Sequence, residues 1–227
     1  MTQAGPLKWR TGAGWLVLIG GGRWNTTELI DRNAIEAMSD ETPIAFVPAA
    51  GCPPDYGESF LAHYTALGAP PGYVVPIHDS ASANDPVNVR RLAQAGLIYF
   101  GGGDTQKLLD AFTGTPALDA VAAAYTSGSV IVGMSAGAIA LAEWGVSSDL
   151  GVGVLKGWGW LPKVIVAPHF IDERADALRA ALVDRPELLG LGIPDDAALA
   201  LGPDGEVLTW GSAQITVTLG PKFDPKG

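Results

Sequence analysis

Residues 129–141 read SVIVGMSAGAIAL, and this stretch gives the strongest indication of the fold. An apolar run is followed at once by the turn GMSAG and then by a helical pattern, AIALAEW, over residues 138–144. Strand, sharp turn and helix in this order form the repeating unit of a sheet covered by helices. The turn also sets Ser135 between Gly133 and Gly137 in the pattern G-x-S-x-G, which is typical of a nucleophile lifted above a sheet.

The same alternation of strand and helix extends over most of the chain. Short apolar runs occur at residues 15–19, 43–49, 72–77, 97–100, 129–133 and 164–168. Between the first five lie stretches with helical apolar spacing, at residues 28–38, 57–69, 88–96, 105–112 and 117–125. Runs that are apolar on both faces predict a parallel sheet with helices on each side.

The last third of the chain has a different pattern. Residues 197–211 contain two alternating segments around Pro203-Asp204-Gly205, a turn signal for a hairpin, and residues 214–219 give a further strand. We therefore expect antiparallel edge strands on a mostly parallel sheet. The length of 227 residues and the absence of a linker or repeat indicate one domain over residues 1–227.

Composition narrows the class of partner. The formal net charge is −10 with no run of Lys or Arg, which argues against nucleic acid and anionic membranes. No apolar run approaches the roughly 20 residues needed to cross a bilayer. Cys52 is the one cysteine, so neither a disulfide nor a cysteine-rich metal site is expected, and we predict a cytoplasmic protein without a cofactor or metal.

Ligands of such sheets bind beyond the carboxyl ends of the strands. Five unusual loops follow the apolar runs there: GGGRWN, AAGCPPDYG, GGGDTQ, GMSAG and PHFIDER. We expect these loops to converge on one edge and to carry the chemistry.

A serine nucleophile needs a base, and the chain has three histidines. His63 lies within a helical pattern, and His78 follows an apolar run in a setting that also suits a turn. His169 ends an apolar run 34 residues after Ser135 and is the best placed. A histidine satisfied by backbone groups at a strand end is the alternative.

The third residue should be a carboxylate that orients the imidazole. The stretch LGIPDDAAL offers Asp195 and Asp196, and we favour Asp196. Asp172 and Glu173, which follow His169 closely, stay open as alternatives, as does a solvated Asp-Asp turn.

An oxyanion formed by attack on an acyl group needs N–H donors. The N–H of Ala136 follows the serine directly, and the glycines of GGGDT, Gly102 and Gly103, allow backbone amides to approach a ligand. A phosphate-binding loop is the rival interpretation of GGGDT. The chain lacks both G-x-x-x-x-G-K-[ST] and G-x-G-x-x-G, so nucleotide binding is not favoured.

Four stretches together resemble the S51 serine peptidases, the family of peptidase E and cyanophycinase. They are GGGDTQKLL, GMSAGAIAL, APHF and LGIPDDAAL, in the family's order over residues 101–199. The resemblance implies a three-layer α/β/α sandwich similar to class I glutamine amidotransferases, a flavodoxin-like arrangement. It also implies that Ser135 is the nucleophile and His169 the base, with Asp196 where peptidase E has a glutamate.

The same resemblance points to substrate-binding residues. Arg174 is similar in position to an arginine that recognises the substrate's aspartate, although the loop after Phe170 is shorter here. The family's GGGNT is GGGDT in this chain, so Asp104 could receive a free α-amine, with Thr105 beside it. Ala167 stands where cyanophycinase has an aspartate, which weakens the likeness to that enzyme.

The sequence thus predicts a serine peptidase that hydrolyses short peptides, such as Asp-X dipeptides, through an acyl-enzyme. Alternatives are a cyanophycinase-like or other amide hydrolase or esterase, and a small-ligand-binding domain without catalysis. A homodimer is compatible with the sequence, which leaves the oligomeric state open.

Overall fold

The computed structural model describes residues 5–38, 42–147 and 153–225, and its larger sheet has seven strands. Five of them are parallel in the order β1-β5-β4-β2-β3, and β10 and β11 extend the β1 edge in antiparallel pairings. The predicted mostly parallel sheet with antiparallel edge strands is confirmed. The strands are β1 (Leu16–Ile19), β2 (Ile44–Val47), β3 (Gly72–Val74), β4 (Leu97–Phe100), β5 (Val130–Met134), β10 (Ala197–Leu201) and β11 (Val207–Gly211).

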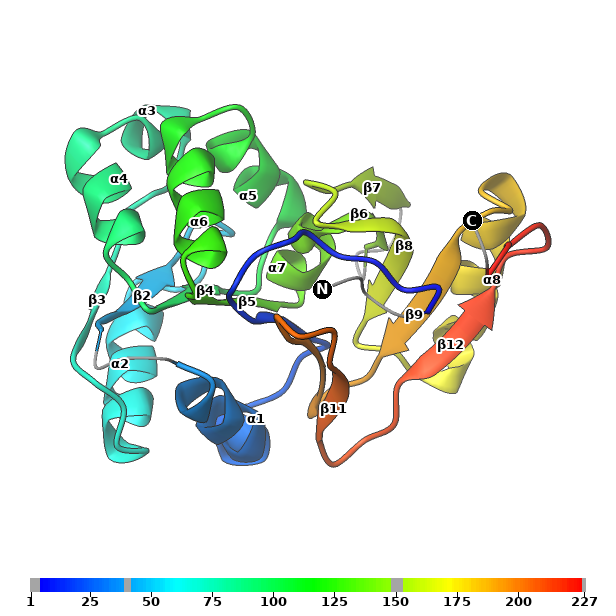
Figure 1. Cartoon of the computed structure of the whole chain (residues 1–227), viewed down its shortest axis with the longest axis horizontal. Coiled ribbons are helices and arrows are strands. Elements are labelled where there is room, and N and C mark those ends of the chain that lie inside the picture. Colours follow the sequence, from blue (N-terminus) through cyan, green and yellow to red (C-terminus); the bar gives the residue numbers. More distant parts are fainter. Residues whose placement is uncertain (1–4, 39–41, 148–152, 226–227) are drawn as a thin grey trace.

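Helices cover both faces of this sheet (Figure 1). The face with α1 (Trp24–Glu36) and α2 (Tyr56–Ala66) receives Val17 and Ile19 of β1. The opposite face receives Leu16 and Leu18, because successive side chains of a strand point to opposite sides. That face is covered by α3 (Ser80–Ala83), α4 (Pro86–Ala93), α5 (Thr105–Phe112), α6 (Pro116–Thr126) and α7 (Ala136–Leu141).

A second sheet holds the remaining strands, in the order β12-β9-β8-β6-β7. Its strands β6, β8 and β9 are parallel, while β7 and β12 pair antiparallel at its edges. Figure 1 shows it beside the first sheet, next to α8. The elements are β6 (Ala142–Val146), β7 (Val154–Lys156), β8 (Leu161–Pro168), β9 (Leu189–Ile193), β12 (Thr216–Leu219), the 3-10 helix η1 (Asp172–Arg174) and α8 (Ala175–Asp184).

The second sheet departs from the sequence prediction, which placed the run at 164–168 and the strand at 214–219 in the same sheet as the others. Both lie in the second sheet, as β8 and β12. The expected helix over 138–144 ends at Leu141, and Trp144 lies in β6. A six-residue helix is too short for the usual crossover of about a dozen or more residues between parallel strands. The chain therefore leaves the first sheet after α7 and starts another.

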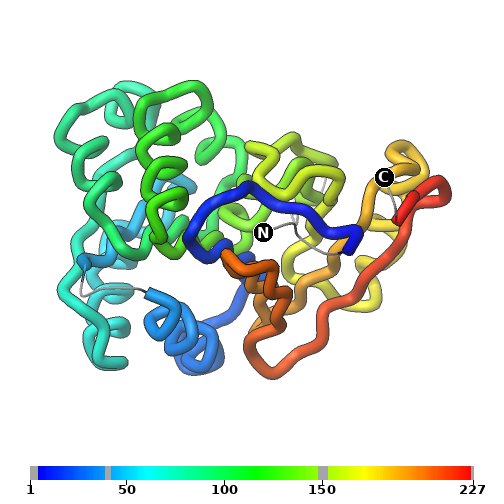
Figure 2. Tube along the Cα trace, viewed as in Figure 1, coloured from blue at the N-terminus to red at the C-terminus, as the bar shows by residue number. Residues whose placement is uncertain are grey.

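The chain passes between the sheets from α7 to β6, from β9 to β10 and from β11 to β12, and the N-terminal segment contacts both parts. Figure 2 shows the chain leaving β11 and running to β12 in the second sheet. The N-terminal segment passes across both parts: the N–H of Arg10 donates to the Trp160 carbonyl at 2.7 Å, and its carbonyl accepts from the Tyr125 hydroxyl at 2.8 Å. The Arg10 guanidinium lies 4.9 Å from the centre of the Trp160 ring. The relative placement of the sheets is thus fixed by side-chain and backbone contacts.

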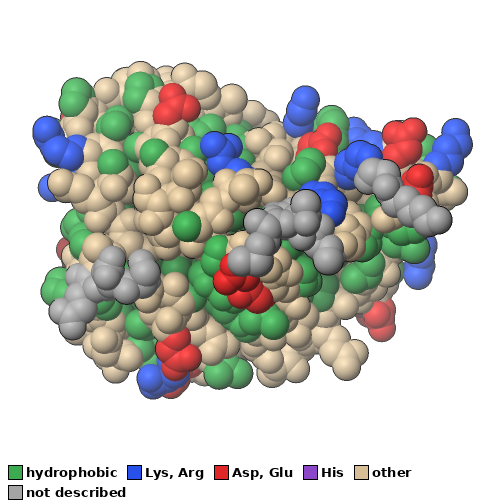
Figure 3. All heavy atoms as spheres, viewed as in Figure 1, with side chains coloured by type: hydrophobic (Ala, Val, Ile, Leu, Met, Phe, Trp, Pro, Cys, Tyr) green, Lys and Arg blue, Asp and Glu red, His purple; other side chains and the backbone are tan. Residues whose placement is uncertain are grey.

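The surface carries charges of both signs. On the face in Figure 3, Lys and Arg side chains lie scattered among Asp and Glu side chains and uncharged ones. None of the helices within the described residues combines the length and apolar character needed to span a bilayer. In the same part of the chain there is no group of three or more His, Cys, Asp or Glu side chains arranged to hold a metal ion.

Candidate active site

Ser135 occupies a strained turn between β5 and α7. Its φ is 53° and its ψ −103°, a conformation that residues with a side chain rarely adopt. The flanking glycines leave room for it. A Cβ on Gly133 would lie 2.5 Å from the Gly137 carbonyl carbon, and one on Gly137 would lie 2.7 Å from the Phe100 carbonyl oxygen. The turn has the form of a nucleophile elbow.

His169 follows β8 in the second sheet and meets Ser135 of the first. Its Nε2 lies 2.8 Å from the Ser135 Oγ. The backbone of His169 is also left-handed, with a φ of 50°. The His169 side chain is 35% exposed, so solvent and a small substrate can reach the imidazole. Strand-end position and turn geometry together place the imidazole against the serine hydroxyl.

The carboxylate that contacts His169 belongs to Asp195, whereas the sequence analysis favoured Asp196. Asp195 Oδ1 lies 2.6 Å from His169 Nδ1. Asp196 has a left-handed φ of 62°, and its backbone is fixed by hydrogen bonds to Gly21 and Ser212. This turn directs the Asp196 side chain to Gly22, where its Oδ1 is buried with no hydrogen-bond partner among the described residues.

Three successive carbonyls at the end of β1 connect these segments. Ile19 accepts a hydrogen bond from the N–H of Ser135 at 2.9 Å, Gly20 from that of His169 at 3.2 Å, and Gly21 from that of Asp196 at 3.0 Å. The loop GGGRWN was noted in the sequence only as unusual. Its three glycines directly after a buried strand were the signal of a close backbone approach.

Gly21 has no room for a side chain. A Cβ there would lie 2.3 Å from His169 Cε1 and 2.3 Å from Asp195 Oδ1. We expect Gly21→Ala to displace the imidazole and to lower kcat about 100-fold, the order of loss that a misplacement of about 1 Å causes. Steady-state kinetics on a cleaved peptide measures this.

The control for this variant is Gly68→Ala, at a turn with nothing within 4 Å of the added methyl group. Its φ of 87° makes the substitution mildly destabilising without any contact to the site. A Gly21→Ala enzyme with unchanged kcat would show that the Gly21 contact does not set the position of His169.

The predicted oxyanion donors lie around Ser135. A Cβ on Gly102 would lie 3.4 Å from the Ser135 Cβ, so this loop passes directly beside the serine. Gly103 has a φ of 138° and packs against the Ala50 carbonyl, so there is no space for a side chain at this position. The N–H groups of Gly102, Gly103 and Ala136 donate to no acceptor within the described part of the chain. These donors are free for a ligand.

The three predicted substrate-binding residues are placed less directly. Asp104 caps α5: its Oδ1 accepts from the N–H groups of Gln106 at 2.9 Å and Lys107 at 3.1 Å. Thr105 is buried at the start of the same helix. Arg174 ends η1, and no hydrogen bond or ion pair joins its side chain to another described residue. Asp172 and Glu173 lie in the same 3-10 helix, and neither makes a hydrogen bond or ion pair with His169.

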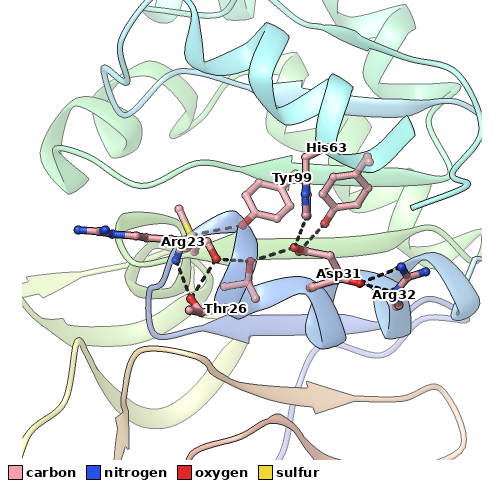
Figure 4. A network of polar contacts seen from close by, with 10 residues as sticks. Arg23, Thr26, Asp31, Arg32, His63 and Tyr99 are labelled. Atoms are coloured by element: carbon pink, nitrogen blue, oxygen red, sulfur yellow. Dashed lines mark hydrogen bonds and ion pairs between the residues drawn. The ribbon is translucent and has the colours of Figure 1, made fainter. Parts of the chain in front are cut away.

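His63 belongs to a buried network around Asp31 (Figure 4). Its Nε2 lies 2.9 Å from Asp31 Oδ2, and the hydroxyls of Thr27 and Tyr64 each donate to the Asp31 carboxylate at 2.9 Å. Asp31 is 1% exposed. Burial, then the charge of Asp31, raises the pKa of Tyr64 well above its ordinary value, so its hydroxyl remains a donor. This network is structural, as the helical position of His63 suggested.

The Asp31 network predicts a stability effect. Asp31→Ala leaves two hydroxyls and an imidazole without their acceptor, and each unsatisfied buried group costs about 1–3 kcal/mol. We expect the free energy of unfolding to fall by about 3 kcal/mol, measured by urea unfolding followed through tryptophan fluorescence. Asp176→Ala is the control, because its pair with Arg179 is solvent-exposed and its loss should leave the unfolding midpoint unchanged.

The third histidine, His78, and the one cysteine, Cys52, lie elsewhere. Cys52 and His78 line a separate pocket between the loop after β2 and the segment after β3, together with Pro48, Pro53, Pro54, Gly57 and Val74. Burial raises the pKa of the Cys52 thiol, which disfavours the reactive thiolate. Neither residue contacts the Ser135–His169 pair within the described residues.

Solved structures share this fold. A peptidase from an acI-B1 Actinobacterium superposes with a TM-score of 0.76 at 24% identity, covering 92% of this chain and 93% of that one. A putative peptidase E from Listeria monocytogenes EGD-e gives a TM-score of 0.62 at 17% identity, with 88% and 99% covered. At these identities the likeness shows the fold.

Sequence relatives include a cyanophycinase from Geminocystis herdmanii, 26% identical over 85% of this chain and 75% of its own length. A peptidase E from Actinobacillus pleuropneumoniae serotype 3 is 30% identical over 79% of both chains. The chain spans 58% of the length of a Synechococcus elongatus cyanophycinase. Fold and relatives together define a serine-type peptidase. The chain belongs to peptidase family S51, and the model of that family matches residues 16–207.

Proposed function

We propose that the chain hydrolyses short peptides through an acyl-enzyme formed on Ser135. The observation that carries this proposal is the continuous path from the Ser135 Oγ to His169 at 2.8 Å and on to Asp195 at 2.6 Å. With Nδ1 of His169 protonated toward the carboxylate, Nε2 accepts the serine proton as Oγ attacks the carbonyl carbon. Asp195 holds this tautomer and stabilises the imidazolium that forms.

The oxyanion of the tetrahedral intermediate is placed between Ala136 and the loop of Gly102 and Gly103. Each N–H donor of such a site contributes roughly 3 kcal/mol to the barrier reduction. Collapse of the intermediate breaks the C–N bond, and His169 gives its proton to the leaving amine. Water then attacks the acyl-enzyme with His169 as base, which releases the acid and restores Ser135.

The backbone at the site supports this assignment. Among the described residues, four non-glycine residues have a positive φ, namely Ser135, Lys163, His169 and Asp196. Three of the four lie at or next to the proposed triad. Strained conformations of this kind persist where the surrounding structure imposes them, and they concentrate at functional sites.

Asp-X dipeptides are the first substrates to test, with Arg174 as the candidate for the acidic residue. Cyanophycin is the second candidate substrate, because several relatives are cyanophycinases. The test combines a fluorophosphonate probe, whose adduct is mapped by mass spectrometry, with a dipeptide library and cyanophycin. Labelling on Ser135 together with cleavage of a dipeptide supports the proposal; absence of both labelling and cleavage overturns it.

The Arg174→Ala variant, tested with the same library, decides whether Arg174 causes a preference for an acidic residue in the substrate. Retention of an Asp preference in this variant would remove Arg174 from substrate recognition. A substrate profile confined to cyanophycin would assign the second activity instead.

A further inference from the structure

A pocket of about 420 Å³ opens where the end of the GGGRWN loop faces the start of α2. Its lining residues are Gly22, Arg23, Trp24, Asn25 and Tyr56. This volume falls within the range of small-ligand sites. None of these residues belongs to the triad or to the proposed oxyanion donors, so the hydrolytic mechanism leaves the pocket unused.

The pocket adjoins the His169 side of the proposed site. Gly21, which packs on the imidazole and on Asp195, directly precedes the pocket residue Gly22. In the sheet, β1 and β4 flank β5 on opposite sides. The loop after β1 therefore lies across Ser135 from Gly102 and Gly103, which follow β4. His169 protonates the leaving amine, so the pocket on its side is placed for the leaving part of the peptide.

Arg23 gives the pocket its charge. Its guanidinium has no hydrogen bond or ion pair with any residue that the structure describes, whereas Arg32 of α1, the helix that Arg23 precedes, pairs with Glu28 at 2.8 Å. Figure 4 shows the Arg23 side chain extending away from the Asp31 network. In a chain of net charge −10, an anionic substrate group has to be met by an individually placed cation. An arginine fork is suited to a carboxylate.

Two aromatic rings form the apolar part. Trp24 and Tyr56 have ring centres 4.9 Å apart with an angle of 41° between planes. Trp24 also stacks on His63 with centres 5.2 Å apart, and His63 is held by buried Asp31. The Trp24 ring is thus fixed before a ligand arrives, which lowers the entropy cost of binding. Burial, with Cys52 and Asp31 nearby, raises the pKa of Tyr56 to about 12, so this ring stays neutral.

We propose that this pocket binds the C-terminal residue of the peptide, with Arg23 paired to its α-carboxylate and the Trp24–Tyr56 rings against its side chain. This inference rests on the proposed peptidase function. The bond cleaved is then the last one of a short peptide that has a free C-terminus. A C-terminal residue with a large apolar side chain is preferred over alanine.

The experiment compares one cleavable dipeptide with its C-terminal amide, using wild-type enzyme, Arg23→Gln and Arg32→Gln. We expect wild-type kcat/KM to be at least about tenfold higher for the free acid, the contribution of one charge-assisted contact. Arg23→Gln should lose this difference mainly through KM. Arg32→Gln, which changes an exposed arginine within α1, should behave as wild type, and Arg23→Lys should retain part of the preference.

A second comparison uses dipeptides with C-terminal phenylalanine and alanine. Wild type should prefer phenylalanine, and Trp24→Leu should reduce that preference without removing the preference for the free acid. Equal wild-type rates on acid and amide, or an unchanged Arg23→Gln, would overturn the inference while Ser135 labelling leaves the peptidase function standing. An enzyme that is neither labelled nor active on any peptide overturns both.

Discussion

Ser135→Ala is expected to abolish peptide hydrolysis and fluorophosphonate labelling while leaving the fold intact. The substitution removes the Oγ that lies 2.8 Å from His169 Nε2, so no acyl-enzyme can form. Loss of a triad nucleophile elsewhere costs about 10⁶-fold in kcat, and we expect a loss of at least about 10⁴-fold here. Stopped assays on the best dipeptide, with labelling read by intact mass, measure the effect.

Folding controls accompany this variant. The methyl group of alanine fits wherever the serine Cβ fits, although the left-handed backbone at residue 135 remains strained. Urea midpoints of Ser135→Ala and wild type should agree closely. Hydrolysis by the pure variant at the wild-type rate would exclude Ser135 as the nucleophile and with it the acyl-enzyme proposed here.

Asp195→Asn should lower kcat by about 10⁴-fold, the loss seen when the aspartate of a serine triad becomes an amide. The amide can donate to Nδ1 and so favours the tautomer in which Nε2 carries the proton and cannot accept one from serine. KM should change little, because the residue lies behind the imidazole. The measurement is the full rate profile on one dipeptide, with labelling kinetics as a second readout.

Asp196→Asn is the matched control, since it makes the same change one residue further along. Its side chain faces Gly22 and makes no hydrogen bond to His169, so we expect a far smaller effect on kcat. A large loss in Asp196→Asn with little loss in Asp195→Asn would reverse the assignment. The two variants therefore decide which acid orients the base.

The part of the site that sequence could predict is the part fixed by local geometry. Ser135 lies between glycines in a strand-turn-helix pattern, and His169 ends an apolar run. The sequence favoured Asp196, whereas Asp195 contacts His169, because the choice depends on a left-handed φ at Asp196 that hydrogen bonds to Gly21 and Ser212 impose. Such long-range bonds leave no trace in the pattern of a nine-residue stretch.

The fold shows the same division. The strands and helices of the first sheet follow from hydrophobic periodicity, including the hairpin of β10 and β11 around Pro203-Asp204-Gly205. The second sheet was not predicted, since AIALAEW continues a helical pattern through Trp144 while the chain switches to a strand after Leu141. Pairing of β6 with β8 overrides that local preference.

The three carbonyls at the end of β1 also make the proposed triad depend on contacts between distant parts of the chain. They bind segments of both sheets, and β1 itself pairs with β10, about 180 residues later in the sequence. Ser135 is synthesised before His169 and Asp195. Contacts between residues that are this far apart in the sequence form late in folding. The proposed triad is therefore complete only when both sheets have formed and the end of β1 holds their segments together.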